Sequence, residues 1–544
     1  MARGTSRVEL IPGGSRPRVY VDGRPLSGPD AQAALERRLP EALEQTLYLL
    51  FSPLHGAGID QWLHQLPVSS AALLVELDTE LADLRHTLAE WHPHRCLVEA
   101  YSEPATIAAV RQLVARSALR RVRGVGLTGG YRLHRERYDH VTHTAVHEVE
   151  RFWRNRGTEI RLYRRWVSNL FRNAALAATP IGALRRRIRR RVILLGAGPA
   201  LDHVLPSLAA LPARERETVS VVAIDTALPS LAGWDVVPDL VVAMDGQVAN
   251  ARDLVPWRWR GVPLLADLTT HPSLVRRFPP ENRHFFVTPF VRQGLFEDPQ
   301  LTELFRDLPR VPPRGSVAPA AVSLLGHELG VREILLVGID FWYRPPATHA
   351  RESTGFRLLR AASHRLAHRD GWDRTLHRPW TTVRLRDGSQ APGDAVLADQ
   401  AAQFRAAVAA VTPATVVRHW GNAGLELGTQ GLEDGSLAAW LRHGHTGVDG
   451  ASPPADTAPL AEVEPPQRAR EILTGLLERL RIQESQLADP QRPVFLDAGL
   501  AFALVDLPQW PLMTLRREWM ELHRQRVLRA VRDYRRRLAA VLEH

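Results

Sequence analysis

Residues 191–198 read Arg-Val-Ile-Leu-Leu-Gly-Ala-Gly, and Pro199, Ala200, Leu201 and Asp202 follow at once. An apolar run that ends in a glycine turn and then a helix start is how an α/β protein builds a nucleotide-binding corner. Glycine lets the backbone approach a phosphate, and the N–H groups at the start of the next helix attract negative charge. The stretch therefore predicts a strand, a turn and a helix beside an anionic ligand.

Three further strand-like runs end in an aspartate: Val221–Asp225, Leu240–Asp245 and Ile334–Asp340. Open α/β sheets bind their ligands at the carboxyl ends of parallel strands. Because residues 190–435 alternate such runs with amphipathic segments, they predict a doubly wound, Rossmann-like α/β domain whose site lies at these strand ends.

The composition excludes several kinds of chemistry. The chain has 544 residues and no lysine, so all 70 basic residues are arginine. A Walker-type phosphate lysine and the Schiff-base lysine of pyridoxal enzymes are therefore excluded. The one cysteine, Cys96, rules out an internal disulfide framework and a cysteine zinc site.

The hydropathy and charge of the chain indicate its location and its partners. No apolar run approaches the ~18 residues of a membrane span, and the first residues lack the apolar core of a signal peptide. We therefore expect a cytoplasmic protein. The net charge is +11 and arginines cluster at Arg185–Arg191, but no aromatic residues that would stack bases are interleaved with them. We expect no nucleic-acid partner.

Five segments are expected along the chain. A small N-terminal α/β domain is followed by a helical connector with an aromatic stripe, the central domain, a linker rich in Pro and Ala, and a C-terminal helical module. The N-terminal domain carries only part of a dinucleotide fingerprint, so we expect it to bind no cofactor. The predicted boundaries are residues 1–140, 141–188, 189–445, 446–467 and 468–544.

The central domain carries two more candidate elements. Gly315 and Ser316 stand at a loop-to-helix junction, where a hydroxyl and backbone N–H groups can hold a phosphate. His349 lies in a Pro-rich loop beyond the strand that ends in Asp340. A histidine in that position can accept a proton from a hydroxyl near neutral pH.

These motifs together resemble the motility-associated factor family of bacterial flagellin glycosyltransferases, and a bacterial sialyltransferase family with a Rossmann-type core. The resemblance is strongest over residues 185–435. It implies transfer of a nonulosonic acid (sialic, pseudaminic or legionaminic type) from its CMP-activated form to serine or threonine of flagellin, in support of flagellar assembly and motility. The motifs that carry it are Gly196–Asp202, Ala223–Leu228, Pro238–Asp245, Gly315–Ala321 and Val337–Phe341.

The resemblance also implies roles for single residues. The glycine loop would hold the CMP phosphate, Ser316 would hydrogen-bond the donor, and His349 would be the general base. No cofactor besides the CMP-sugar and no protein-bound metal is expected. The complete predicted donor-binding set is Gly196, Gly198, Pro199, Asp225, Thr226, Asp245, Gly246, Gly315, Ser316 and Asp340.

The sequence departs from the family pattern at three positions. Ala200 stands where the family motif has serine, and Asp225 and Asp245 stand where the sialyltransferases have asparagine. Two carboxylates would thus lie beside an anionic donor. Either a cation such as Mg²⁺ compensates their charge, or the aspartates bind ribose hydroxyls.

Two other functions remain open. An archaeal-type 6-hydroxymethylpterin diphosphokinase shares the Gly-x-Gly-Pro loop and the Pro-Asp…Asp-Gly strand, although that family is shorter and uses paired acids for magnesium. A non-catalytic nucleotide-binding scaffold for flagellar assembly is the third reading, and Ala200 favours it.

Overall fold

The computed structural model describes residues 7–543, except 13–16, 28–32, 34–35, 57, 85–87, 89–91, 95–96, 118, 255–260, 290–294, 296–297, 346, 370–374, 376, 433–436, 444–465 and 506–516. Contacts divide the chain into two compact units. Unit 1 comprises Met1–Arg161 and Leu504–Arg524, and unit 2 comprises Leu162–Ala503 and Gln525–His544. The predicted linker 446–467 lies outside the described residues except for its last two.

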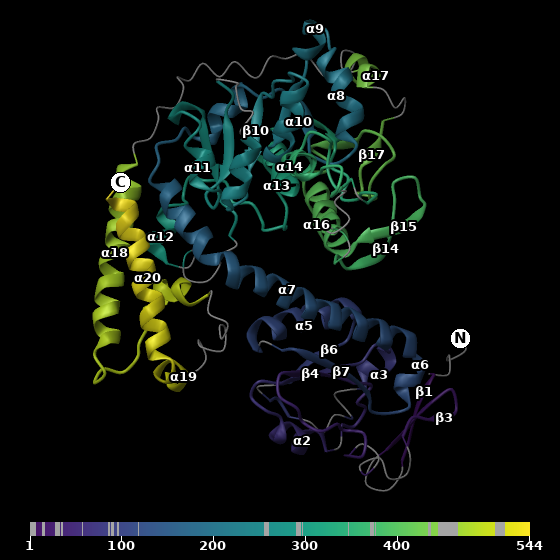
Figure 1. Ribbon diagram of the computed structural model, residues 1–544. Coiled ribbons are helices and arrows are strands. Elements are labelled where there is room, and N and C mark those ends of the chain that lie inside the picture. The colour runs from purple at the N-terminus through teal and green to yellow at the C-terminus, as the bar shows by residue number, and fades with distance from the viewer. Residues whose placement is uncertain are drawn as a thin grey trace. The chain divides into compact units, whose positions relative to one another are not determined.

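Unit 1 is built on a four-stranded parallel sheet with the strand order β6-β5-β4-β7. Its central strand, β4, is buried at every residue. Helix α5 (Glu103–Ser117) contacts β5 and β6 (Figure 1). A separate antiparallel sheet joins β1 (Val8–Ile11), β2 (Arg18–Val21) and β3 (Arg24–Pro25). The four parallel strands are β4 (Thr46–Phe51), β5 (Ala71–Val75), β6 (Leu97–Ala100) and β7 (Arg121–Gly126).

Unit 2 contains an eight-stranded parallel sheet in the order β12-β11-β10-β9-β8-β13-β16-β17. The doubly wound, Rossmann-like α/β class predicted from the sequence is confirmed. The strands are β8 (Arg191–Leu195), β9 (Ser220–Ile224), β10 (Leu240–Ala243), β11 (Leu264–Asp267), β12 (Arg283–Phe286), β13 (Glu333–Val337), β16 (Val416–His419) and β17 (Gln430–Gly431).

The strand order reverses between β8 and β13. From β8 the chain builds outward to β12, and it then crosses to the other side of β8 to form β13. Ligands of open α/β sheets bind outside the carboxyl ends of the strands at such a reversal. A ligand site is therefore expected at the loops that follow β8 and β13.

Apolar side chains cover both faces of this sheet, which is why its strands read as continuous hydrophobic runs. On one face, Leu194 of β8 and Leu336 of β13 pack with Phe404 of α16 in a single core cluster. Ile193 and Leu195, which point to the other face, are also fully buried. The helices between and beside the strands include α8 (Leu201–Ala209), α10 (Leu228–Gly233), α11 (Pro272–Val275), α12 (Pro299–Glu303), α13 (Val317–Ser323), α14 (Thr354–Ala362) and α16 (Ala395–Val411) (Figure 1).

The aromatic connector is part of one long helix, α7 (Arg135–Ala174), whose last residues belong to unit 2. The C-terminal helices α18 (Gln467–Ala488) and α20 (Arg524–Leu542) also belong to unit 2. They are joined by ion pairs from Glu484 to Arg532 and Arg535. The division into five segments stays a prediction, since the contacts group these helices with the sheet.

Candidate functional site

The loops after β8 and β13 touch through their backbones at the strand-order reversal. The N–H of Gly196 donates to the carbonyl of Val337 at 2.8 Å, and that of Gly198 to the carbonyl of Gly338 at 2.7 Å. A Cβ on Gly196 would lie 2.5 Å from the Gly338 oxygen, and one on Gly198 would lie 2.5 Å from Asp340 Oδ2. The two glycines are required here because a side chain at either position would push the loops apart.

The start of α8 is occupied by a carboxylate of the protein. Oδ2 of Asp340 accepts a hydrogen bond from the amide of Ala200 at 3.1 Å. The N–H groups of Gly196 and Gly198 already donate to backbone carbonyls, and Pro199 has no N–H. In this arrangement, none of these three positions of the predicted phosphate loop has an N–H available for a phosphate. Phosphate binding by this loop therefore stays a prediction, and it requires Asp340 to release Ala200.

Asp340 is buried together with a counterion. Burial raises its pKa to about 6, while the nearby charge of Arg386 and the Ala200 amide act in the opposite direction. Arg386 Nη1 lies 3.9 Å from Asp340 Oδ1, and Oδ1 forms no hydrogen bond within the described residues. The Arg386 guanidinium donates to the carbonyls of Ile339, Ala423 and Leu425. These bonds fix Arg386 beside the β13 loop.

A cluster of three carboxyl groups lies at the ends of β9 and β10. Asp225 follows β9 directly, Asp245 follows β10, and Asp253 belongs to the short helix Val248–Leu254. Burial, followed by the charges of Asp253 and Asp245, raises the pKa of Asp225 to about 8. Burial also raises the pKa values of Asp245 and Asp253. Asp225 is therefore mostly protonated at pH 7.

Within this cluster, Asp225 keeps one oxygen without a hydrogen bond from the part of the chain that the structure describes. Asp225 Oδ1 accepts from the Thr226 amide at 2.9 Å, but its Oδ2 is buried without a partner among the described residues. Asp245 Oδ1 accepts from the Gln247 amide at 2.8 Å. Since β8, β9 and β10 are neighbours, the strands that precede the glycine loop and Asp245 lie about two strand spacings, ~10 Å, apart. Within the described residues no group of three or more His, Cys, Asp or Glu is arranged to hold a metal ion.

The end of α7 fixes the loops after β10 and β11. Nδ2 of Asn169 donates to the carbonyls of Gly246 and Thr269, both at 3.0 Å. Trp166 packs so closely on Gly246 that a Cβ there would meet its ring at 2.8 Å. The charge of Arg165 opposes the raised pKa of Asp245. Gly246 is thus needed for the contact between α7 and the sheet edge.

Gly315 and Ser316 lie at the start of α13, as the sequence indicates. The Ser316 hydroxyl caps the helix by accepting from the Ala318 amide at 3.4 Å, and Gly315 takes a left-handed φ of +69°. The Gly315 carbonyl accepts from Gln400 of α16 at 3.2 Å. Among the described residues, no hydrogen bond or ion pair joins Gly315 or Ser316 to the glycine loop or to the aspartates.

His349 is exposed on a loop that crosses the glycine loop. The next amide, that of Ala350, donates to the carbonyl of Ala197 at 2.9 Å, and the amide of Arg351 donates to Asp202 at 3.1 Å. His349 Nδ1 lies 3.0 Å from the Thr348 hydroxyl. The structure therefore brings His349 next to the loop after β8, on the solvent side.

Several residues of this edge were missed from the sequence. Asp253 is not at a strand end, and Arg386 comes from the loop after β14 (Trp380–Arg384), before β15 (Gln390–Asp394). Neither carries a motif, so only the fold brings them to the site. Asp267 at the end of β11 was also missed, but its oxygens accept from Thr269 and Thr288 and stabilise the loops rather than face a ligand.

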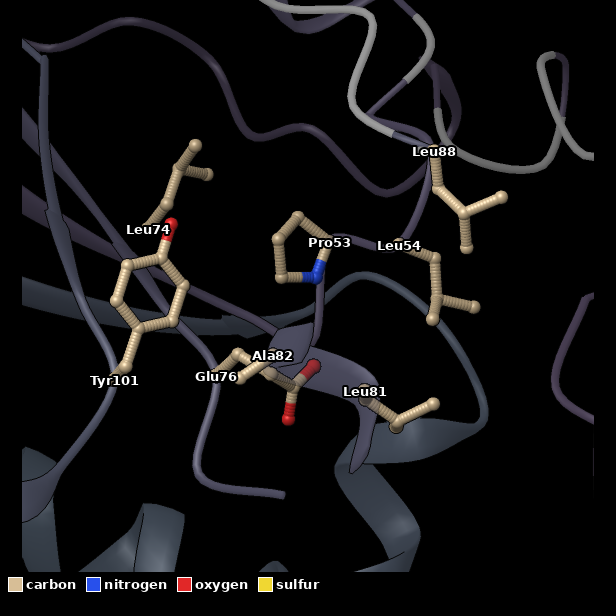
Figure 2. A pocket seen from close by; sticks show the side chains of 8 residues that line it. All are labelled: Pro53, Leu54, Leu74, Glu76, Leu81, Ala82, Leu88 and Tyr101. Atoms are coloured by element: carbon tan, nitrogen blue, oxygen red, sulfur yellow. The ribbon is translucent and has the colours of Figure 1, made fainter. Parts of the chain in front are cut away.

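Unit 1 has a small pocket at the equivalent edge of its own sheet. Figure 2 shows the residues that line it, among them Glu76, which follows β5, and Pro53 and Leu54 of the loop after β4. Glu76 accepts hydrogen bonds from the Tyr138 hydroxyl at 2.8 Å and the Asp78 amide at 3.0 Å. The cavity of about 20 Å³ has room for little more than one water molecule. That unit 1 binds no cofactor stays a prediction.

The fold and the strand-end loops define a Rossmann-like α/β protein with a candidate site at a strand-order reversal. Residues 164–345 match the family model described as 6-hydroxymethylpterin diphosphokinase MptE-like. An uncharacterized protein of Treponema pallidum (strain Nichols) is 27% identical over 350 residues, which cover 62% of this chain and 59% of that protein. This chain thus matches less than two thirds of the relative's length.

One solved structure resembles nearly the whole chain. It is described as the structure of MAf glycosyltransferase from Magnetospirillum magneticum AMB-1. The TM-score is 0.57 at 12% sequence identity, and the likeness covers 99% of this chain and 91% of that one. The two chains therefore share a fold across both units. None of the described helices is long and apolar enough to cross a membrane.

Proposed function

We propose that this chain is a glycosyltransferase that moves a nonulosonic acid from its CMP-activated form to serine or threonine of flagellin in the cytoplasm. The observation that carries the proposal is the fold likeness to the Maf glycosyltransferase over 99% of the chain. The diphosphokinase-like match covers only residues 164–345 and leaves unit 1 and the C-terminal helices unexplained.

The protonation of Asp225 supports an anionic donor. A carboxyl group with a pKa of about 8 is neutral at pH 7, so it adds no negative charge beside the CMP phosphate. Its protonated oxygen donates a hydrogen bond, which suits a ribose or sugar hydroxyl. In this proposal Asp225, Thr226, Asp245 and Gly246 contact the donor's hydroxyls, and no metal ion is required.

The phosphate of the donor lies against the loop Gly196–Pro199 in this account. Its binding displaces the Asp340 carboxylate from the Ala200 amide, which then donates to the phosphate at the start of α8. Arg386 remains beside the displaced carboxylate and compensates its charge. Gly315 and Ser316 at the start of α13 complete the donor site.

His349 is the general base that deprotonates the acceptor. Its ring takes the proton from a serine or threonine hydroxyl as the oxygen attacks the anomeric carbon of the sugar. The bond from that carbon to the phosphate oxygen breaks, and CMP leaves with the bonding electrons. The exposed position of His349, next to the anchored Ala350, allows a protein surface to approach it.

A 6-hydroxymethylpterin diphosphokinase activity is the second candidate, because residues 164–345 match that family's model. It would use ATP and magnesium instead of a CMP-sugar. The Asp225, Asp245 and Asp253 cluster is its best candidate for a magnesium site, although these groups are not arranged around a metal position.

Nucleotide-dependent thermal stabilisation of the full-length protein separates these functions. The glycosyltransferase proposal expects CMP to raise the melting temperature equally with Mg²⁺ and with EDTA. A shift with ATP and Mg²⁺ but not with CMP would instead favour the diphosphokinase. Stabilisation by CMP without turnover of a CMP-sugar would indicate a non-catalytic scaffold.

A further inference from the structure

A second pocket lies within unit 2, between the end of α7, the start of α11 and the C-terminal helices α18 and α20. Its volume is about 390 Å³. Three arginines line it, Arg172, Arg276 and Arg470, together with His271 and Ser273. No aspartate or glutamate is among its lining residues, and Val541 belongs to its apolar part.

The positive charge of this pocket is not compensated. Within the described residues, Arg172, Arg276 and Arg470 form no ion pair. Other arginines of the same helix α18 behave differently, since Arg468 pairs with Glu303 and Arg479 with Asp298. Guanidinium groups that converge on one hollow without a carboxylate repel one another, and a bound anion would relieve that repulsion.

His271 adds a neutral donor to the arginines. Burial, followed by the charges of Arg172 and Arg165, lowers the pKa of His271. Its Nδ1 accepts from the Ser273 amide at 3.2 Å, which leaves the ring proton on Nε2. At neutral pH the pocket therefore holds three guanidinium groups and one neutral N–H donor.

The helices that line the pocket are held in place by contacts outside it. Arg479 Nη2 of α18 lies 2.7 Å from Asp298 Oδ2, which caps α12. Phe502 contacts the ring of Phe171 on α7 and the ring of Tyr534 on α20, at centroid distances of 6.1 and 5.3 Å. A pocket formed before binding spares the ligand the cost of ordering it.

We propose that this pocket binds a small organic anion carrying a phosphate or carboxylate group. Both groups match the planar guanidinium through paired hydrogen bonds. The volume lies in the range of small-molecule sites, which exceeds the needs of a simple inorganic ion. The pocket adjoins the candidate site, because the His271 amide donates to the Asp245 carbonyl, but none of the loop residues after β8 or β13 lines it.

Isothermal titration of the full-length protein at low ionic strength tests this assignment. The probes are inorganic phosphate, glucose 6-phosphate and N-acetylneuraminate. We expect the wild type to bind at least one organic probe. We expect Arg276→Gln to weaken binding about 10- to 100-fold, because a charge-assisted hydrogen bond is lost. Tighter binding of glucose 6-phosphate assigns a phosphate ligand, and tighter binding of N-acetylneuraminate assigns a carboxylate ligand.

The matched control is Arg214→Gln, which removes an exposed arginine of α9 (Ala213–Arg216), away from the lining residues. It should bind as the wild type does. Arg172 and Arg276 are exposed, so Arg172→Gln and Arg276→Gln should not melt below the wild-type temperature. Absence of binding to all three probes at millimolar concentration, or equal binding by Arg276→Gln and Arg214→Gln, would overturn the proposal. The result does not depend on whether the protein transfers a sugar.

Discussion

Asp340 accepts a hydrogen bond from the amide of Ala200, with 3.1 Å between Oδ2 and the amide nitrogen, and so joins the loop after β13 to the first turn of α8. The two residues are 140 positions apart, and β8 and β13 are neighbours in the sheet. The start of a helix favours anions, and here it is closed by the protein's own carboxylate. We therefore expect ligand binding at this position to be coupled to stability.

Replacing Asp340 tests that coupling. Asp340→Ala removes the bond to Ala200 and also the ion-pair partner of the buried Arg386. Among the described residues, only the charge of Glu426 then remains near this guanidinium. We expect a loss of about 3–5 kcal/mol in the free energy of unfolding, measured by urea denaturation. The control is Asp387→Ala at an exposed neighbouring position, which should destabilise the protein far less than Asp340→Ala. Equal stability of the two variants would mean that Asp340 does not stabilise this junction.

The loops after β8 and β13 approach each other so closely that a side chain at Gly198 should disturb both. In Gly198→Ala the new Cβ would lie 2.5 Å from Asp340 Oδ2 and 2.7 Å from the Gly338 oxygen. We expect destabilisation by about 1–3 kcal/mol and weaker binding of CMP. Gly182→Ala, where no atom lies within 4 Å of the added carbon, should be nearly neutral. Unchanged CMP affinity in Gly198→Ala would separate the loop from the donor site.

The raised pKa of Asp225 predicts how stability depends on pH. An unfolded aspartate ionises near pH 3.8 and the folded Asp225 near 8, so the folded state favours the protonated form. This contribution to stability is complete below about pH 4 and is lost as the pH rises through 8. Asp225→Asn cannot ionise, so its melting temperature should fall less than that of the wild type between pH 5 and 9.

We expect the difference between Asp225→Asn and the wild type to be a few degrees in melting temperature, measured by circular dichroism across the pH series. The exposed Asp307→Asn serves as the control and should follow the wild-type curve. Parallel curves for Asp225→Asn and the wild type would show that Asp225 is ionised in the folded protein at neutral pH.

The sequence predicted the sheet well, because parallel strands buried on both faces are read directly as apolar runs. The predicted strand Val221–Asp225, for example, matches β9 to within one residue. The helix predicted to follow Gly315 and Ser316 begins at Val317, but after Ser323 it passes into a π-helical turn (Leu324–Glu328). Within the predicted C-terminal helical module, residues 506–516 lie outside the described residues, and a break at His523 separates α19 (Arg517–Leu522) from α20.

The site was predicted less completely than the fold. Asp225 and Asp340 were found because they follow strands, and strand ends share one edge of the sheet. Their partners Asp253 and Arg386 come from elements without periodicity or motif, so their positions depend on tertiary packing. The sequence also could not show that the Ala200 amide donates its hydrogen bond to Asp340 and not to a phosphate.

His349 carries the sharpest prediction about chemistry. Loss of a general base lowers rates by about 10²- to 10⁴-fold, so His349→Ala should reduce sugar transfer by that factor. CMP binding should be unchanged, because the loop is anchored through the backbone of Ala350 and not through the histidine ring. Transfer at the wild-type rate would remove His349 from the mechanism, and loss of CMP binding would make it a donor-site residue.

The intact mass of purified flagellin, after incubation with this protein and a CMP-activated nonulosonic acid, tests the proposed transfer. We expect mass additions of one nonulosonic acid residue at serine or threonine, with release of one CMP for each. Unmodified flagellin in the presence of a protein that binds CMP, or turnover of ATP and 6-hydroxymethylpterin in its place, would contradict it.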